Sequence, residues 1–133
     1  MIDVFCPEGC FSEEHSGEVL RRLTEAFLKW TDASEIPIAR DNTGAFLHVF
    51  PAACVTAGGE PARAVRIDVK VPNVVLSTIE RRRGLIADAS EIVATLASAG
   101  QAPPRAWVTI SNTADGGWGI SGRGFTNAEL DEI

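Results

Sequence analysis

The sequence repeats itself at half its length. Ile2-Asp3-Val4 followed by Pro7 recurs as Ile67-Asp68-Val69 followed by Pro72, so position 2 corresponds to position 67 in a chain of 133 residues. The same offset relates two further identical pairs, Ser12 with Ser77 and Leu20 with Leu85. A repeat of this kind indicates that one supersecondary unit is used twice. We therefore expect a single domain made of repeat one, residues 1–64, and repeat two, residues 65–133.

Each repeat predicts a strand at its start. Ile2–Cys6 and Val65–Val71 are rich in β-branched and apolar residues. In the second segment every other residue is valine or isoleucine and the residues between are charged, which is the period of a half-buried strand. Pro7 and Pro72 end these strands, because proline has no N–H to donate to a neighbouring strand.

An amphipathic helix follows in each repeat. The predicted apolar stripes are Val19, Leu20, Leu23, Phe27 and Trp30 in the first helix, and Ile79, Ile86, Ala89, Val93 and Leu96 in the second. Ser12 is the expected N-cap of the first helix. Ser77 with Glu80 predicts a capping box for the second. The basic run Arg81–Arg83 is expected on a solvated helix face.

A second strand completes each repeat. These strands are Ala45–Phe50 and Ala106–Ser111, and glycine-rich turns at 57–59 and 116–119 predict a short hairpin after each. A helix that crosses over between two strands makes them parallel. Two such units side by side predict an α+β fold, in which two β-α-β repeats form a four-stranded mixed sheet with two helices on one face. The other face is left bare, so the pattern favours an oligomer.

This arrangement resembles the tautomerase superfamily, whose long members fuse two β-α-β units and include malonate semialdehyde decarboxylase, cis-3-chloroacrylic acid dehalogenase and macrophage migration inhibitory factor. The most specific match is Trp118-Gly119-Ile120-Ser121-Gly122, which looks like the Phe-Gly-Ile-Gly-Gly segment near the C-terminus of 4-oxalocrotonate tautomerase, a short member. Pro7-Glu8-Gly9 is similar to the turn after the first strand of short members. The resemblance covers nearly the whole chain and implies a homotrimer.

The resemblance also implies a catalytic base that this sequence lacks. Family enzymes use an N-terminal proline, whereas position 2 here is Ile2. Methionine aminopeptidases need a small second residue, so Met1 is expected to stay and to carry a primary amine, whose ordinary pKa is about 7.7–8.0. Two interpretations stay open: the protein has lost the base, or the true start is a Met-Pro upstream of Met1.

Four residues are candidates for the site. The Met1 amine is the candidate proton carrier. Arg105 lies near the place of an arginine that precedes the last strand in short members and holds the substrate carboxylate, and Trp118 matches their aromatic pocket wall. His48 has a near-neutral pKa on an apolar strand. The alternatives are a solvated Arg105, a Trp118 that packs between subunits, and a half-buried His48 with its hydrogen bonds satisfied.

One departure from the family argues against decarboxylase or dehalogenase chemistry. Long members place two carboxylate-binding arginines just after the third strand, and the matching stretch, Pro72–Leu76, has none.

Composition excludes several classes of function. The net charge of −6 argues against nucleic-acid binding. No apolar run approaches the length that spans a membrane, and the N-terminus does not resemble a signal peptide, so we expect a cytoplasmic protein. The three cysteines, Cys6, Cys10 and Cys54, are read as reduced thiols, and no metal or organic cofactor is predicted.

Three functions remain in competition. The first is an isomerase that moves a proton in a small enol or keto acid. The second is a non-catalytic trimeric binding protein that keeps the fold without the catalytic proline. The third is a monomeric binding module with a ferredoxin-like fold, which shares the β-α-β doubling.

Overall fold

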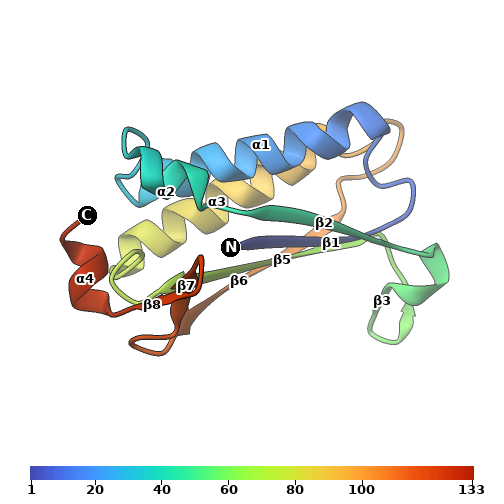
Figure 1. Ribbon diagram of the computed structural model, residues 1–133. Coiled ribbons are helices and arrows are strands. Elements are labelled where there is room, and N and C mark those ends of the chain that lie inside the picture. Colours follow the sequence, from blue (N-terminus) through green and yellow to red (C-terminus); the bar gives the residue numbers. More distant parts are fainter.

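The computed structural model describes all 133 residues and is built around a four-stranded sheet of order β2-β1-β5-β6 (Figure 1). Strand β1 (Ile2–Pro7) pairs parallel with β2 (Ala45–Phe50) and antiparallel with β5 (Ala64–Pro72), which pairs parallel with β6 (Arg105–Thr113). Helix α1 (Glu13–Trp30) connects β1 to β2, and α3 (Ile79–Leu96) connects β5 to β6. Both helices lie on one face of the sheet, which confirms the predicted α+β architecture.

The core lies between the two helices and the sheet. Alternate strand residues, such as Val4 and Ile67, are fully buried against helix residues such as Leu23, Leu85 and Val93. Together they belong to one cluster of 20 buried residues. No helix is long and apolar enough to cross a membrane.

The other sheet face carries no helix, as expected. It presents a mixture of charged and aromatic side chains, among them Asp3, Phe5 and Arg66, whose guanidinium carbon lies 4.3 Å from the Phe5 ring centre. Trp107 on β6 is 45% exposed on this face. A half-exposed tryptophan on a bare sheet is typical of a surface that is covered in an assembly.

The remaining elements are short. They are the helix α2 (Pro37–Asp41), the 3₁₀ turn η1 (Ala52–Cys54), the hairpin of β3 (Thr56–Ala57) with β4 (Glu60–Pro61), the hairpin of β7 (Trp118–Ile120) with β8 (Arg123–Phe125), and the helix α4 (Asn127–Asp131). The first hairpin turns at Gly58-Gly59, within the predicted turn, whereas the second turns at Ser121-Gly122, just after the predicted stretch 116–119. The two short helices were not predicted, because five residues are too few to display a helical period.

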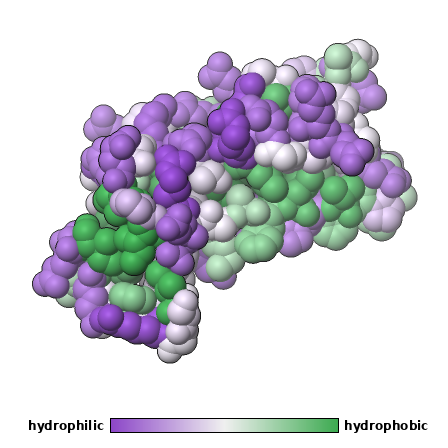
Figure 2. All heavy atoms as spheres, turned by 45° about the horizontal axis from the view of Figure 1, so that its top comes forward, coloured by the Kyte–Doolittle hydropathy of each residue, from purple (hydrophilic) through white to green (hydrophobic).

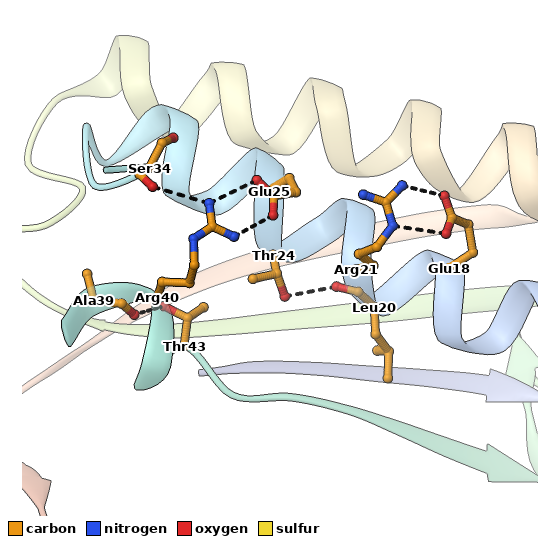
Figure 3. Close-up of polar contacts among 9 residues, drawn as sticks. All are labelled: Glu18, Leu20, Arg21, Thr24, Glu25, Ser34, Ala39, Arg40 and Thr43. Atoms are coloured by element: carbon orange, nitrogen blue, oxygen red, sulfur yellow. Dashed lines mark hydrogen bonds and ion pairs between the residues drawn. The ribbon is translucent and has the colours of Figure 1, made fainter. Parts of the chain in front are cut away.

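Helix α2 is tied to α1 by one arginine. The Arg40 guanidinium donates to both carboxylate oxygens of Glu25, at 2.6 and 3.3 Å, and to the Ser34 carbonyl at 3.2 Å (Figure 3). A surface ion pair of this kind contributes only about 0–1 kcal/mol to stability. Its main effect is therefore on position, since it fixes α2 against the C-terminal half of α1 at one end of the sheet.

Two details of α3 differ from the prediction. Its N-cap is Thr78, whose hydroxyl accepts from the Arg81 N–H, and not Ser77. Ile79 and Ile86, which were assigned to the apolar stripe, are exposed. The buried stripe runs instead through Leu85, Ala89, Val93 and Leu96. At about 100° per residue Ile79 lies roughly 120° around the helix from Leu85, so both cannot face the core.

The close approach of α1 and α3 depends on a glycine. Trp30 at the end of α1 lies over Gly84 of α3, and its indole N–H donates to Asp88 at 2.7 Å. Lys29 donates to the same carboxylate oxygen at 2.7 Å. A Cβ added to Gly84 would lie 2.3 Å from the Trp30 ring, which is well inside van der Waals contact.

We predict that Gly84→Ala destabilises the fold by about 1–3 kcal/mol in urea unfolding, because the Trp30 ring must leave its place and its bond to Asp88. Gly17→Ala in α1 is the matched control. An added Cβ there meets nothing within 4 Å, so the helix gains about 0.5–1 kcal/mol of propensity. Equal stabilisation by both substitutions would contradict the packing described for Trp30.

Candidate active site

A mostly apolar pocket lies at one end of the sheet. Its volume is about 360 Å³, within the range of small-molecule sites, and 13 of its 20 lining residues are hydrophobic. Its walls come from four parts of the chain: the end of α1, helix α2, the segment after β5, and the C-terminal unit of β7 and α4. Figure 2 shows hydrophobic side chains gathered at the left end of the molecule, where Figure 1 places α2 and α4.

Met1 lies in this pocket, and strand pairing holds its amine there. The α-amino group donates to the Lys70 carbonyl at 2.9 Å, and the Lys70 N–H donates to the Met1 carbonyl at 2.9 Å. The two bonds extend the β1–β5 ladder by one residue pair. Burial lowers the pKa of the amine to about 6; Asp3 opposes this shift and Lys70 adds to it. At neutral pH the amine is therefore mostly unprotonated and carries a free electron pair.

Trp118, the candidate pocket wall of the sequence analysis, is among the residues that line the same pocket. The β7–β8 hairpin places it there through a two-residue turn, Ser121-Gly122, in which both φ angles are positive, 52° and 86°. Two positive φ angles are the mark of a type I′ turn, whose twist matches that of paired strands. Met1 and Trp118, from opposite ends of the sequence, are thus brought to one site.

Arg105 lies elsewhere in the same subunit. It begins β6 opposite Ala64, whereas Met1 pairs with Lys70 at the other end of β5. Six strand residues separate the two positions, which is about 20 Å at 3.3 Å per residue. Arg105 instead borders a shallow surface depression with Glu60 and Arg63. It can serve a Met1 pocket only from a neighbouring subunit.

His48 lies on the bare face of the sheet and outside the pocket. Its Nε2 lies 2.8 Å from an Asp3 carboxylate oxygen, and its ring stacks on Phe5 with 4.4 Å between centroids. The imidazole is partly exposed and has a polar partner. This is the arrangement of the alternative that we considered, a half-buried histidine with its hydrogen bonds satisfied.

Sequence reasoning missed Arg81. It was assigned with Arg82 and Arg83 to a solvated face, and its side chain is indeed 37% exposed. What the sequence did not show is that Arg81 is the only cationic side chain that lines the pocket. Its Nη2 lies 2.7 Å from a carboxylate oxygen of Asp32, a second lining residue. The available signal was its position: Arg81 lies in the first turn of α3, which follows the end of β5 and the segment 73–78, and both of these supply residues of the pocket lining.

The polar remainder of the lining does not form a metal site. No group of three or more histidine, cysteine, aspartate or glutamate side chains is placed to hold a metal ion.

Comparison with known proteins identifies the fold. No family model and no curated protein matches this sequence. Among solved structures, the chain is similar to the R7 fused 4-OT wild-type asymmetric trimer, with 21% identity, a TM-score of 0.77 and 98% of each chain covered. It is also similar to N1, a member of the cis-3-chloroacrylic acid dehalogenase family, with 16% identity and a TM-score of 0.78 over 98% of this chain and 87% of that one. Macrophage migration inhibitory factor of Toxoplasma gondii matches with 15% identity and a TM-score of 0.70 over 93% and 98%.

These similarities confirm the tautomerase-like fold that the repeat and the Trp118–Gly122 segment predicted. They extend over almost the full length of this chain and of the matched chains. At such low identities they establish the fold, and the chemistry has to be argued from the pocket.

The lowered pKa of the Met1 amine gives a direct prediction. Only a neutral amine reacts with an acylating reagent, so labelling of the Met1 amine should have a midpoint near pH 6, when followed by peptide mass spectrometry between pH 5 and 9. Asp3→Asn should lower this midpoint further and Lys70→Gln should raise it, since their charges act on the ammonium form in opposite directions. The exposed Lys29 amine is the internal control, and a Met1 midpoint near the ordinary value of about 8 would refute the buried amine.

Proposed function

We propose that this chain is a tautomerase-like enzyme that moves a proton in a small enol or keto acid, with the Met1 amine as the proton carrier. The observation that carries the proposal is the position of the N-terminal amine at the wall of an apolar pocket that also contains Trp118, where desolvation lowers its pKa to about 6. A general base works best when its pKa lies near the operating pH, and an amine with a pKa of about 6 meets this condition.

The mechanism follows from the groups around the amine. The neutral nitrogen accepts a proton from an enol hydroxyl, or from the carbon next to a carbonyl, and the ammonium form returns it to the other position. The Lys70 carbonyl accepts one N–H and so fixes the direction of the electron pair. The mostly apolar lining, Trp118 included, disfavours the charged ammonium form and so keeps the amine neutral.

The pocket also supports a small substrate. About 360 Å³ has room for an acid of roughly six to ten heavy atoms, and the mostly apolar lining favours a hydrocarbon portion beside the polar reacting carbons.

A homotrimer belongs to the same proposal. The fused 4-OT structure with which this chain shares its fold is a trimer, and the bare sheet face with Trp107 is the surface that such an assembly would cover. In a trimer the Arg105 of one subunit is free to approach the pocket of another, which is the role that the sequence predicted for it. His48, on the same open face, would then lie at a subunit contact.

One observation favours the alternative, a trimeric binding protein without catalysis. The only arginine in the pocket already has a carboxylate partner in Asp32, and no proline supplies the secondary amine that the resemblance implies. Such a protein would bind an acid in the pocket and leave its carbon-bound protons in place.

The test of the catalytic proposal is hydrogen exchange in a 2-oxo acid. Protein whose intact mass shows Met1 as the first residue is mixed with 4-methyl-2-oxopentanoate in D₂O, and loss of the C3 proton signal is followed by NMR. We expect exchange at least tenfold above the buffer rate, and its loss after selective acetylation of the Met1 amine near pH 6.5, because base catalysis contributes about 10²–10⁴-fold. Exchange that survives acetylation would exclude Met1 as the base, and binding without exchange would favour the alternative.

The assembly is tested by sedimentation. We expect a species of about three times the chain mass of 14.2 kDa. Trp107→Glu should shift it toward the monomer, because it puts a charge into a surface that the trimer would desolvate. Ile79→Glu, at an exposed position of α3 on the opposite face, is the matched control. A wild-type monomer would exclude the trimeric proposal.

A further inference from the structure

Asp32 occupies a backbone position that favours glycine. Helix α1 ends in a Schellman motif, in which the Ala33 N–H donates to the Leu28 carbonyl and the Asp32 N–H donates to the Lys29 carbonyl. Asp32 is the residue of this motif with left-handed backbone, and its φ is 55°. Glycine is the usual residue there, and a side chain costs about 1 kcal/mol or more in this conformation. Aspartate is one of the few residues other than glycine that adopt this conformation, and the helix end, whose bonds are made by the backbone, gives no reason for a carboxylate there.

The contact that Asp32 makes does not stabilise the fold enough to be that reason. Its carboxylate meets the Arg81 guanidinium at 2.7 Å, but the Asp32 side chain is 79% exposed and that of Arg81 is 37% exposed. An ion pair as open to water as this one contributes about 0–1 kcal/mol. The pair is consequently easy to break, and its partners line the same pocket as Met1.

Arg81 is placed to bind an anion. It is the third residue of α3, and the positive end of the helix dipole adds to its own charge. Of the other polar side chains of the pocket walls, Thr31, Asn42 and Thr43 donate to carbonyls of their own helices, and Asp131 carries a carboxylate, which has no hydrogen bond to donate. Arg81 is thus the single side chain from which a bound carboxylate can receive charged hydrogen bonds within this subunit.

Asp32 also accepts a hydrogen bond from only one of the N–H groups of the Arg81 guanidinium. The structure has one hydrogen bond between them, from Nη2. A guanidinium can donate two parallel hydrogen bonds to one carboxylate, and such two-point binding is stronger and more directional than a single bond. A ligand carboxylate that approaches from the pocket can therefore replace Asp32 with a gain in bonding and no change in the number of charges at Arg81.

We propose that Arg81 is a carboxylate-binding subsite of the pocket and that Asp32 is its built-in occupant, which a ligand carboxylate displaces. The choice of an organic acid as ligand rests on the proposed function, but the exchange of one carboxylate for another does not depend on catalysis. Asp32 keeps the guanidinium oriented and neutralised while the pocket is empty. It also sets a threshold of affinity, because neutral molecules of the same shape gain nothing from displacing it.

The test is a binding titration on the full-length protein. 4-Methyl-2-oxopentanoate and its neutral amide are titrated separately, and NMR chemical shifts of the Trp118 indole N–H report occupancy of the pocket. We expect Asp32→Asn, which tolerates the same backbone conformation, to tighten binding of the acid about threefold to tenfold, since it removes the competing carboxylate. Arg81→Gln should weaken binding of the acid at least tenfold. Neither substitution should change binding of the amide by more than about twofold.

Two further variants make the result decisive. Asp32→Gly removes the carboxylate and relieves the backbone, so it should tighten acid binding as Asp32→Asn does and also raise stability in urea. Arg83→Gln, on the exposed side of the same turn, is the charge-matched control and should leave acid binding unchanged. Acid binding that is unaltered in Arg81→Gln, or no tighter in Asp32→Asn and Asp32→Gly, would overturn the proposal.

The same samples separate this inference from the catalytic proposal. C3 exchange in D₂O is measured on each variant. If acid affinity depends on Arg81 and Asp32 but no C3 exchange occurs, the subsite is supported and the catalytic function is excluded. If the wild type catalyses C3 exchange but Arg81→Gln leaves acid affinity unchanged, catalysis is supported and the subsite is excluded.

Discussion

The antiparallel pairing of β1 with β5 is the interaction on which the rest of the molecule depends. It joins two β-α-β units, each of which is parallel within itself, into one sheet of four strands. Because the two central strands run in opposite directions, the start of β1 lies beside the end of β5. The reciprocal hydrogen bonds between Met1 and Lys70 are the last pair of this ladder. The N-terminal amine is thus held at the sheet end where the pocket forms.

Both repeats contribute residues to the pocket at the sheet end where Met1 lies. Repeat one supplies the end of α1 and helix α2, which Arg40 ties to Glu25, and repeat two supplies the segment after β5 and the C-terminal hairpin with Trp118. Residues of both repeats therefore surround the partly exposed N-terminus. Since desolvation is the largest cause of its lowered pKa, the chemistry of the N-terminus is a property of the tertiary structure.

The degree to which sequence predicted this structure depends on how local each signal is. Ser12 was correctly identified as a cap because its bond to the His15 N–H is made within one turn. The sheet and both long helices were predicted from periodic patterns of apolar residues, and each pattern occurs in both repeats. The place of Arg81 at the pocket could not be predicted, because its contact is with Asp32, 49 positions away, and Arg105 could not be placed relative to Met1 without the register of β5 and β6. Residue pairs that meet only through tertiary packing leave no local pattern.

A neutral primary amine in this pocket differs from a neutral proline nitrogen in its number of N–H groups. Both can be made neutral by burial, because an apolar surrounding penalises the ammonium form of either. A neutral N-terminal proline has one N–H, whereas the neutral Met1 amine has two, and a buried N–H without an acceptor is unfavourable. The Lys70 carbonyl takes one of them. What then faces the pocket is one N–H and one electron pair, which is the same set of groups that a terminal proline presents. The β1–β5 ladder therefore supplies, through a backbone carbonyl, the compensation that a change from proline to a primary amine requires.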